Sequence, residues 1–146
     1  MPFQFNLAAV LRYRESLEHM EYLALEKLQL AVAALERRIQ QNESTLLEAV
    51  ENRKAILARG IPAAELQSAC EFEIALKQQR VALQAQWKEA RLKWERQLRA
   101  YQAARRKRET LENLRSQQAE RYNRELSKRE QATIDDVFLT RHGRRQ

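Results

Sequence analysis

The chain has 146 residues, of which 32% are charged and 7% aromatic, and its mean hydropathy is -0.73. This composition leaves too little apolar surface for an ordinary globular core, and only 2 Gly and 2 Pro exclude a loop-rich fold. An abundance of Ala, Leu, Glu, Gln, Lys and Arg is instead typical of long helices and coiled coils.

The chain starts with an uncharged stretch from Pro2 to Leu11. A helix that spans a bilayer needs about 20 apolar residues, and no basic segment precedes this stretch. We therefore expect neither a membrane-spanning helix nor a secretory signal here. With Cys70 as the single cysteine, no internal disulfide can form, and the predicted location is the cytoplasm.

A first helix is predicted from about residue 5 to 58, because its apolar residues recur in alternating steps of three and four. We call such a row of side chains, which faces a partner helix, a seam. This seam contains Leu25, Leu28, Val32, Leu35, Ile39, Leu46, Ala49 and Ile56, with Asn42 and Arg53 in its two gaps.

A turn is predicted at about residues 59–62, where one of the two glycines and one of the two prolines occur together. Gly60 can adopt the left-handed conformation just past a helix end, and Pro62 suits the first turn of the next helix. Inside a helix, Pro62 would cost about 3 kcal/mol or more. The chain should therefore stop and start again here.

A second helix is predicted from about 63 to 132, and the pattern leaves open whether the C-terminal tail, about 133–146, is ordered. The seam of this helix contains Leu66, Ala69, Leu76, Leu83, Trp87, Ala90, Trp94, Ala104 and Leu111, with Glu73 and Arg80 among its polar positions. At heptad spacing, the two tryptophans are interpreted as core residues.

The two seams match if the chain folds back at the turn, because facing residues of an antiparallel hairpin have numbers with a constant sum. A sum of 122 pairs Ile56 with Leu66, Leu46 with Leu76, Ile39 with Leu83, Leu35 with Trp87, Val32 with Ala90 and Leu28 with Trp94. An antiparallel dimer of kinked helices has the same sums, but closure within one chain has the higher effective concentration. The prediction is a single all-α domain, an antiparallel two-helix coiled-coil hairpin.

The same register sets Arg14 against Arg108, so we expect the hairpin to be loosest at the end that holds both termini. This is also the basic part of the chain. Residues 80–146 contain 18 Lys and Arg against 9 Asp and Glu, a net charge of +9, whereas residues 1–79 contain 9 against 11, a net charge of -2. The terminal end is therefore the expected site of partner binding.

Four consecutive basic residues, Arg105 to Arg108, form what we call the basic collar, since successive side chains fan around a helix by about 100°. Nucleic acid is not the expected partner, because no aromatic series for base stacking accompanies the basic residues. Attraction to acidic protein surfaces or lipid head groups is favoured over nucleic acid.

No arrangement of residues in the sequence is typical of a catalytic or metal site. His19 and His142 lie near opposite ends of the chain, Cys70 stands alone, and no glycine-rich loop could hold a phosphate. We therefore expect a non-enzymatic protein without a metal or cofactor.

Two terminal patterns, which a heptad repeat does not demand, resemble the FliJ family of coiled-coil proteins from bacterial flagellar type III export. At the start these residues are Phe3, Phe5, Leu7, Val10, Leu11 and Arg14, and near the end they are Glu130, Gln131, Asp135, Asp136 and Arg141. The family's usual Asp-Glu ending stands here as Asp-Asp, a conservative departure. The resemblance covers the whole chain in length and layout.

The resemblance implies an antiparallel coiled coil similar to the stalk of the rotary ATPase gamma subunit. Its implied partners are the hexameric export ATPase, the cytoplasmic domain of the export gate and export substrate chaperones, at the cytoplasmic face of the inner membrane. By resemblance, the ATPase end contains Phe3, Phe5, Leu7, Leu11, Arg14, Glu130, Gln131, Asp135 and Asp136. Phe72 and Leu76 are weaker candidates for the gate-facing surface, with core packing favoured for Leu76.

Two alternatives stay open at this point. The first is the homologous coiled-coil stalk of a virulence type III secretion system, which belongs to the same mechanical class. The second is a basic helical protein that binds nucleic acid or a membrane surface, and such binding would fall steeply with salt.

Overall fold

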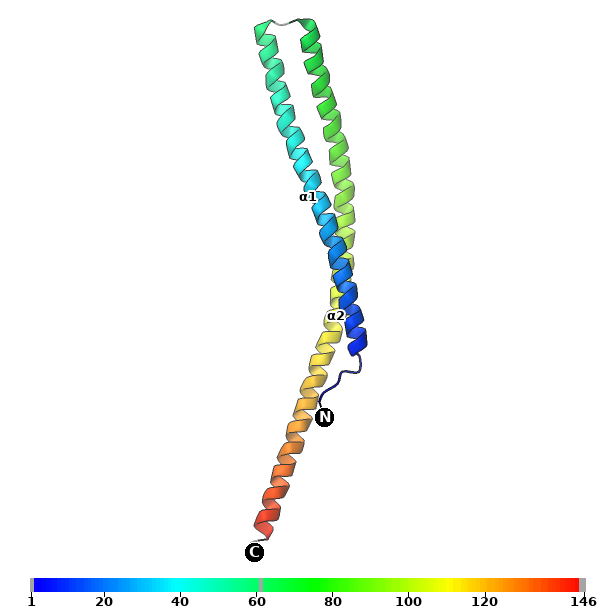
Figure 1. The fold of residues 1–146 in the computed structure, drawn as a ribbon, viewed down its shortest axis with the longest axis vertical. Coiled ribbons are helices and arrows are strands. Elements are labelled where there is room, and N and C mark those ends of the chain that lie inside the picture. Colours follow the sequence, from blue (N-terminus) through cyan, green and yellow to red (C-terminus); the bar gives the residue numbers. More distant parts are fainter. Residues whose placement is uncertain (1, 61, 145–146) are drawn as a thin grey trace. The chain divides into compact units, whose positions relative to one another are not determined.

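The structure, a computed structural model, describes residues 2–60 and 62–144. It contains two long helices, α1 (Ala8–Arg59) and α2 (Ala63–Gly143), which pack against each other as a helical hairpin (Figure 1). The predicted all-α hairpin is therefore confirmed. Within the described ranges, neither helix is long and apolar enough to cross a membrane.

The chain divides into two compact units. The turn-side unit contains residues 21–101, and the terminal unit contains residues 1–20 together with 102–146. Each unit is built from one stretch of α1 and one stretch of α2.

The turn has the backbone that its glycine predicts. Gly60 has a φ of 68°, the only positive φ among the described residues. An L-residue in this left-handed conformation is strained by about 1–2 kcal/mol, although open space surrounds the position. After the turn, the carbonyl of Pro62 accepts hydrogen bonds from the N–H groups of Glu65 and Leu66, at 3.1 and 3.4 Å. Part of the predicted turn, Ile61, lies outside the described residues.

The helix ends differ from the sequence prediction. α1 begins at Ala8 rather than near residue 5, and α2 continues through Gly143 rather than ending near 132. Helix is possible this far because neither Gly nor Pro interrupts residues 63–142. Arg141 and His142 in the last turn also complement the negative end of the helix dipole.

The core of the turn-side unit consists of predicted seam residues. Its buried side chains are Val32, Asn42, Ala49, Glu73, Leu76 and Leu83. Two of them are polar and make contacts between the helices. Asn42 donates through Nδ2 to the carbonyl of Leu76 and to Oε1 of Gln79, both at 3.3 Å. A buried Asn in a seam fixes register at some cost in stability, because only one alignment satisfies its amide.

Further contacts keep close to the expected register. Arg53 and Glu73 form an ion pair between the helices, with Arg53 Nε 3.0 Å from Glu73 Oε2. Trp87 is half-buried and donates from its indole nitrogen to Glu36, while Tyr22 packs on Tyr101 with ring centroids 5.9 Å apart. The residue numbers of this aromatic pair add up to 123, close to the 122 expected from the seams.

Candidate functional site

The terminal unit starts with a segment outside the helices, residues 2–7, that we call the strap; it ends in a turn in which the N–H of Ala8 donates to the carbonyl of Phe5 at 3.1 Å. Phe3 and Phe5 are both half-buried. The ring of Phe3 lies 5.7 Å from that of Tyr122, centroid to centroid. Together with Ala8, Arg115, Ser116 and Ala119, the two phenylalanines line an open hollow of about 440 Å³. The strap therefore holds its aromatic side chains against α2.

Leu11 and Arg14 follow the strap on α1. Leu11 is 3% exposed and belongs to the core of the terminal unit, although by resemblance it was expected among the ATPase-contacting residues. Arg14 is half-buried, and its guanidinium carbon lies 5.9 Å from the centre of the Tyr13 ring. Leu7, at 37% exposure, is at the edge of the surface. The N-terminal pattern thus mixes one core residue with surface residues.

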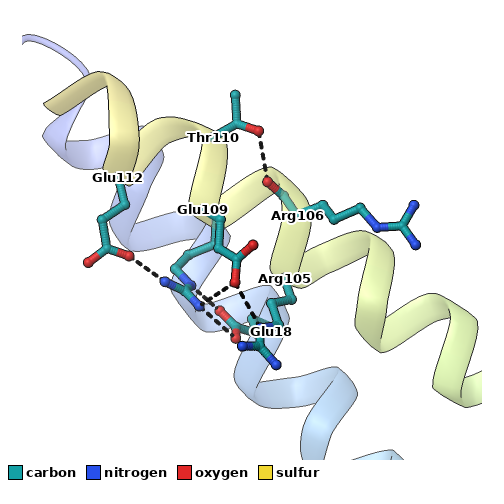
Figure 2. A network of polar contacts seen from close by, with 7 residues as sticks. Glu18, Arg105, Arg106, Glu109, Thr110 and Glu112 are labelled. Carbon is teal, nitrogen blue, oxygen red and sulfur yellow. Dashed lines mark hydrogen bonds and ion pairs between the residues drawn. The ribbon is translucent and has the colours of Figure 1, made fainter. Parts of the chain in front are cut away.

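A network of ion pairs, the Arg108 cluster, joins the two helices of this unit (Figure 2). Arg108 donates from Nε to Glu18 Oε2 at 2.5 Å and from Nη2 to Glu18 Oε1 at 3.3 Å. Its Nη1 donates to Glu112. On the same stretch of α2, Arg105 donates from Nε to Glu109 at 2.9 Å.

This cluster corrects the expected meeting of two like charges, Arg14 and Arg108. In the structure Arg108 binds Glu18 instead, one helical turn along α1. Glu18, as the main cause, raises the pKa of the Arg108 guanidinium above its ordinary value; burial opposes this effect, and Glu112 adds to it. The two carboxylates thus favour the charged form of the guanidinium.

The basic collar is only partly available to a partner. Arg105 and Arg108 are engaged in ion pairs, whereas the Arg106 side chain points away from the cluster (Figure 2). Side chains that are held in ion pairs attract an acidic ligand less than free ones do. The collar is therefore a weaker basic surface than its sequence suggests.

Beyond Tyr122, α2 has no partner helix in the terminal unit. Every residue from 123 to 144 is exposed, and we call this stretch the overhang. It contains Glu130, Gln131, Asp135 and Asp136, the C-terminal half of the predicted ATPase site. Gln131 donates from Nε2 to Asp135 at 3.0 Å, a contact within one helical turn.

The predicted ATPase residues therefore form two groups. One group lies on the strap and the start of α1, and two of its members, Phe3 and Phe5, line a hollow with residues 115–119 of α2. The other group lies on the overhang, beginning about 12 Å further along α2 than Tyr122 at 1.5 Å per residue. Among the described residues, the hollow of about 440 Å³ that Phe3 and Phe5 line includes no residue of the overhang.

The turn-side unit contains the two gate candidates. Phe72 is 52% exposed, whereas Leu76 is 7% exposed and accepts the Asn42 hydrogen bond through its carbonyl. Two open hollows of about 370 and 250 Å³ both include Phe72 in their walls. Phe72 is thus available to a partner, while Leu76 packs in the core, as the sequence favoured.

Sequence reasoning missed two features of the terminal unit. One is the role of Glu18, whose contact with Arg108 appears only when the two helices are aligned. The other is a row of exposed apolar side chains on the overhang, which contains Leu126, Ile134, Val137 and Phe138. Helical spacing is the signal that identifies this row, and most of it lies in the tail beyond residue 132, where the sequence predicts no helix.

Among residues 2–60 and 62–144, no group of three or more His, Cys, Asp or Glu side chains is placed to hold a metal ion. The exposed surfaces of these residues include the overhang and the region around Phe72 on α2, with the strap packed beside α2. The fold defines the class of protein as an all-α coiled-coil hairpin with exposed helix surface.

Residues 3–146 match the sequence profile of the family described as Flagellar FliJ protein. The chain belongs to the FliJ family. It is therefore a non-enzymatic, coiled-coil component of the flagellar export apparatus. Members of this family are cytoplasmic components of that apparatus, and the partners of this chain lie within it. Searches of the curated proteins and of the solved structures found no match.

Proposed function

We propose that the protein couples the hexameric export ATPase to the export gate, with the terminal unit as the ATPase-binding part. The observation that carries this proposal is the overhang, a stretch of α2 in which all described side chains are exposed. An isolated helix of this length is marginal in water, and most helices gain their stability by packing an apolar face. The overhang is therefore a segment that needs a binding partner.

The overhang offers a partner both charge and apolar surface. Asp135 and Asp136 form an acidic pair next to the exposed side chains of Val137 and Phe138. Apolar anchors surrounded by charged groups are typical of protein interfaces, where aromatic residues contribute much of the affinity. Glu130 and Gln131 lie about one turn of α2 before the acidic pair, and successive steps of about 100° put Glu130 on a different side of the helix from Asp135 and Asp136. The proposed ATPase contact therefore surrounds the overhang helix.

In this proposal, the strap and the start of α1 stabilise the part of α2 from which the overhang extends. Phe3 and Phe5 hold the strap to α2, and Leu11 acts from the core rather than by touching the ATPase. Leu7 and Arg14 are the residues of the N-terminal group that a partner could reach beside the overhang. The Arg108 cluster keeps the start of α1 aligned with α2.

The proposal is tested by measuring ATP hydrolysis by the cognate export ATPase with and without the full-length chain. We expect the protein to bind the ATPase and to change its rate of hydrolysis. A chain that neither binds the ATPase nor alters hydrolysis would contradict the proposed coupling.

For the export gate, we propose that Phe72 is the contact residue of the turn-side unit. Replacing Phe72 with Asp should weaken binding to the cytoplasmic domain of the gate about tenfold or more, because exposed aromatic anchors often contribute over 1 kcal/mol. The thermal midpoint should change little, since the side chain is half exposed. Calorimetric titration with the purified gate domain measures the affinity.

Val81→Asp is the matched control, since Val81 is 64% exposed on the same helix and lines neither hollow beside Phe72. It should leave gate binding unchanged. If both substitutions weaken binding equally, the effect is one of added charge, and Phe72 is not the specific contact.

Two further parts of the proposal rest on family membership. We propose that the protein escorts export substrate chaperones, and that it is located peripherally at the cytoplasmic face of the inner membrane. The net charge of +7 supports attraction to an acidic surface there.

A further inference from the structure

The overhang carries a seam of its own, and no helix among residues 2–60 and 62–144 covers it. Glu130, Ile134, Val137 and Arg141 are separated by steps of four, three and four, so they lie on one face of α2. Ile134 is 61% exposed and Val137 is 46% exposed. We call these four residues the overhang seam.

Only local contacts support this helix in the described structure. Thr133 and Thr140 donate to backbone carbonyls four residues earlier, and Phe138 stacks on His142 with ring centroids 4.0 Å apart. None of these contacts covers Ile134 or Val137. A heptad row of this kind is typically covered by another helix.

We propose that the overhang seam binds the overhang seam of a second copy of this chain, with the two helices antiparallel. In an antiparallel pair centred between Asp135 and Asp136, each Ile134 faces the second copy's Val137. Each Glu130 then faces the second copy's Arg141, because both pairs of residue numbers add up to 271. The surface is thus complementary to itself.

The charges select the antiparallel direction. Parallel pairing would place Glu130 against Glu130 and Arg141 against Arg141, two like-charge contacts that oppose association. Antiparallel pairing converts both into ion pairs at the two ends of an apolar centre. Asp135 and Asp136 do not interfere, since steps of about 100° place them on the outer side of the helix.

The size of the seam predicts a weak dimer. Two apolar seam side chains from each copy, flanked by Phe138, bury less surface than the standard interface of stable complexes. Association should therefore depend on concentration. Because Glu130 also belongs to the proposed ATPase surface, the ATPase and the second copy would compete for one face of the helix.

A charge-swap experiment on the full-length chain tests this proposal. Sedimentation equilibrium over a range of concentrations should show a monomer–dimer equilibrium for the unchanged protein. Glu130→Arg alone and Arg141→Glu alone should each weaken dimerisation about tenfold or more, since each change converts both ion pairs into like-charge contacts. The double variant should restore dimerisation, because it exchanges the charges across both pairs.

The matched control is Lys128→Glu, which changes the charge as Arg141→Glu does but lies on the outer side of the overhang. It should leave the dimerisation constant unchanged, and circular dichroism should show equal helix content in all variants. A chain that stays monomeric at every concentration would overturn the proposal. The proposal would also be overturned if Glu130→Arg or Arg141→Glu alone dimerised as the unchanged protein does, or if the double variant stayed monomeric.

Adding the export ATPase separates this proposal from the proposed function. Dimers that dissociate as ATPase binds would support competition for one face. A chain that is monomeric alone and binds the ATPase through the overhang would assign the seam to the ATPase and end the dimer proposal. A dimer that never binds ATPase would instead contradict the proposed coupling.

Discussion

A chain that ends at Asn123 is expected to bind the export ATPase about a hundredfold more weakly than the full-length protein. The truncation removes the overhang with its acidic pair and exposed apolar side chains, and the loss of two or more anchors costs about 3 kcal/mol. It leaves Tyr122 in place to contact Phe3, and it leaves the Arg108 cluster intact. Titration with the ATPase and its rate of ATP hydrolysis measure the effect.

A matched control for the truncation is a chain that ends after Thr140, which keeps Asp135, Asp136 and Phe138. It should bind the ATPase nearly as well as the full-length chain. If the chain ending at Asn123 also binds with full affinity, then the strap and the start of α1 carry the contact, and the overhang has another role.

Leu11→Ala is expected to destabilise the terminal unit by about 2–4 kcal/mol, because it leaves a cavity where a side chain only 3% exposed had packed. The effect should appear as faster amide hydrogen exchange in residues 8–20 and 102–122, while the turn-side unit keeps its protection. Mass spectrometry of proteolytic peptides resolves the two units.

Val10→Ala serves as the control for Leu11, since Val10 is the neighbouring residue and 42% exposed. We expect its exchange rates to change only slightly. Equal protection in the Leu11 variant, combined with weaker ATPase binding, would show that Leu11 contacts the ATPase directly, as the family resemblance implied.

The sequence alone was sufficient to predict the hairpin. Two glycines and two prolines leave few places to break a helix, the heptad steps of the two seams predict antiparallel helices that face each other, and a short turn favours pairing within one chain. Buried residues such as Val32, Leu76 and Leu83 could be named because position in a heptad largely determines burial. Heptad spacing depends only on residues close together in the chain, so it can be read directly from the sequence.

The candidate site could be predicted only in part. The terminal patterns identified the residues, but not their environments: Leu11 proved to be core, while Phe3 and Phe5 pack on α2. Whether a seam residue is covered depends on how far the partner helix extends beside it. How far α1 runs beside α2 depends on the alignment of the two helices in the folded chain, and the sequence of either helix alone does not give it.

Composition and heptad spacing thus determined the class of fold, the place of the turn and most of the core, because each follows from residues close together in the chain. Only the tertiary structure decided that Arg108 meets Glu18, since side chains 90 residues apart in sequence meet only through the alignment of two helices. It likewise decided that residues 123–144 remain exposed. α2 is the longer helix, and in the terminal unit it continues past the start of α1 (Figure 1).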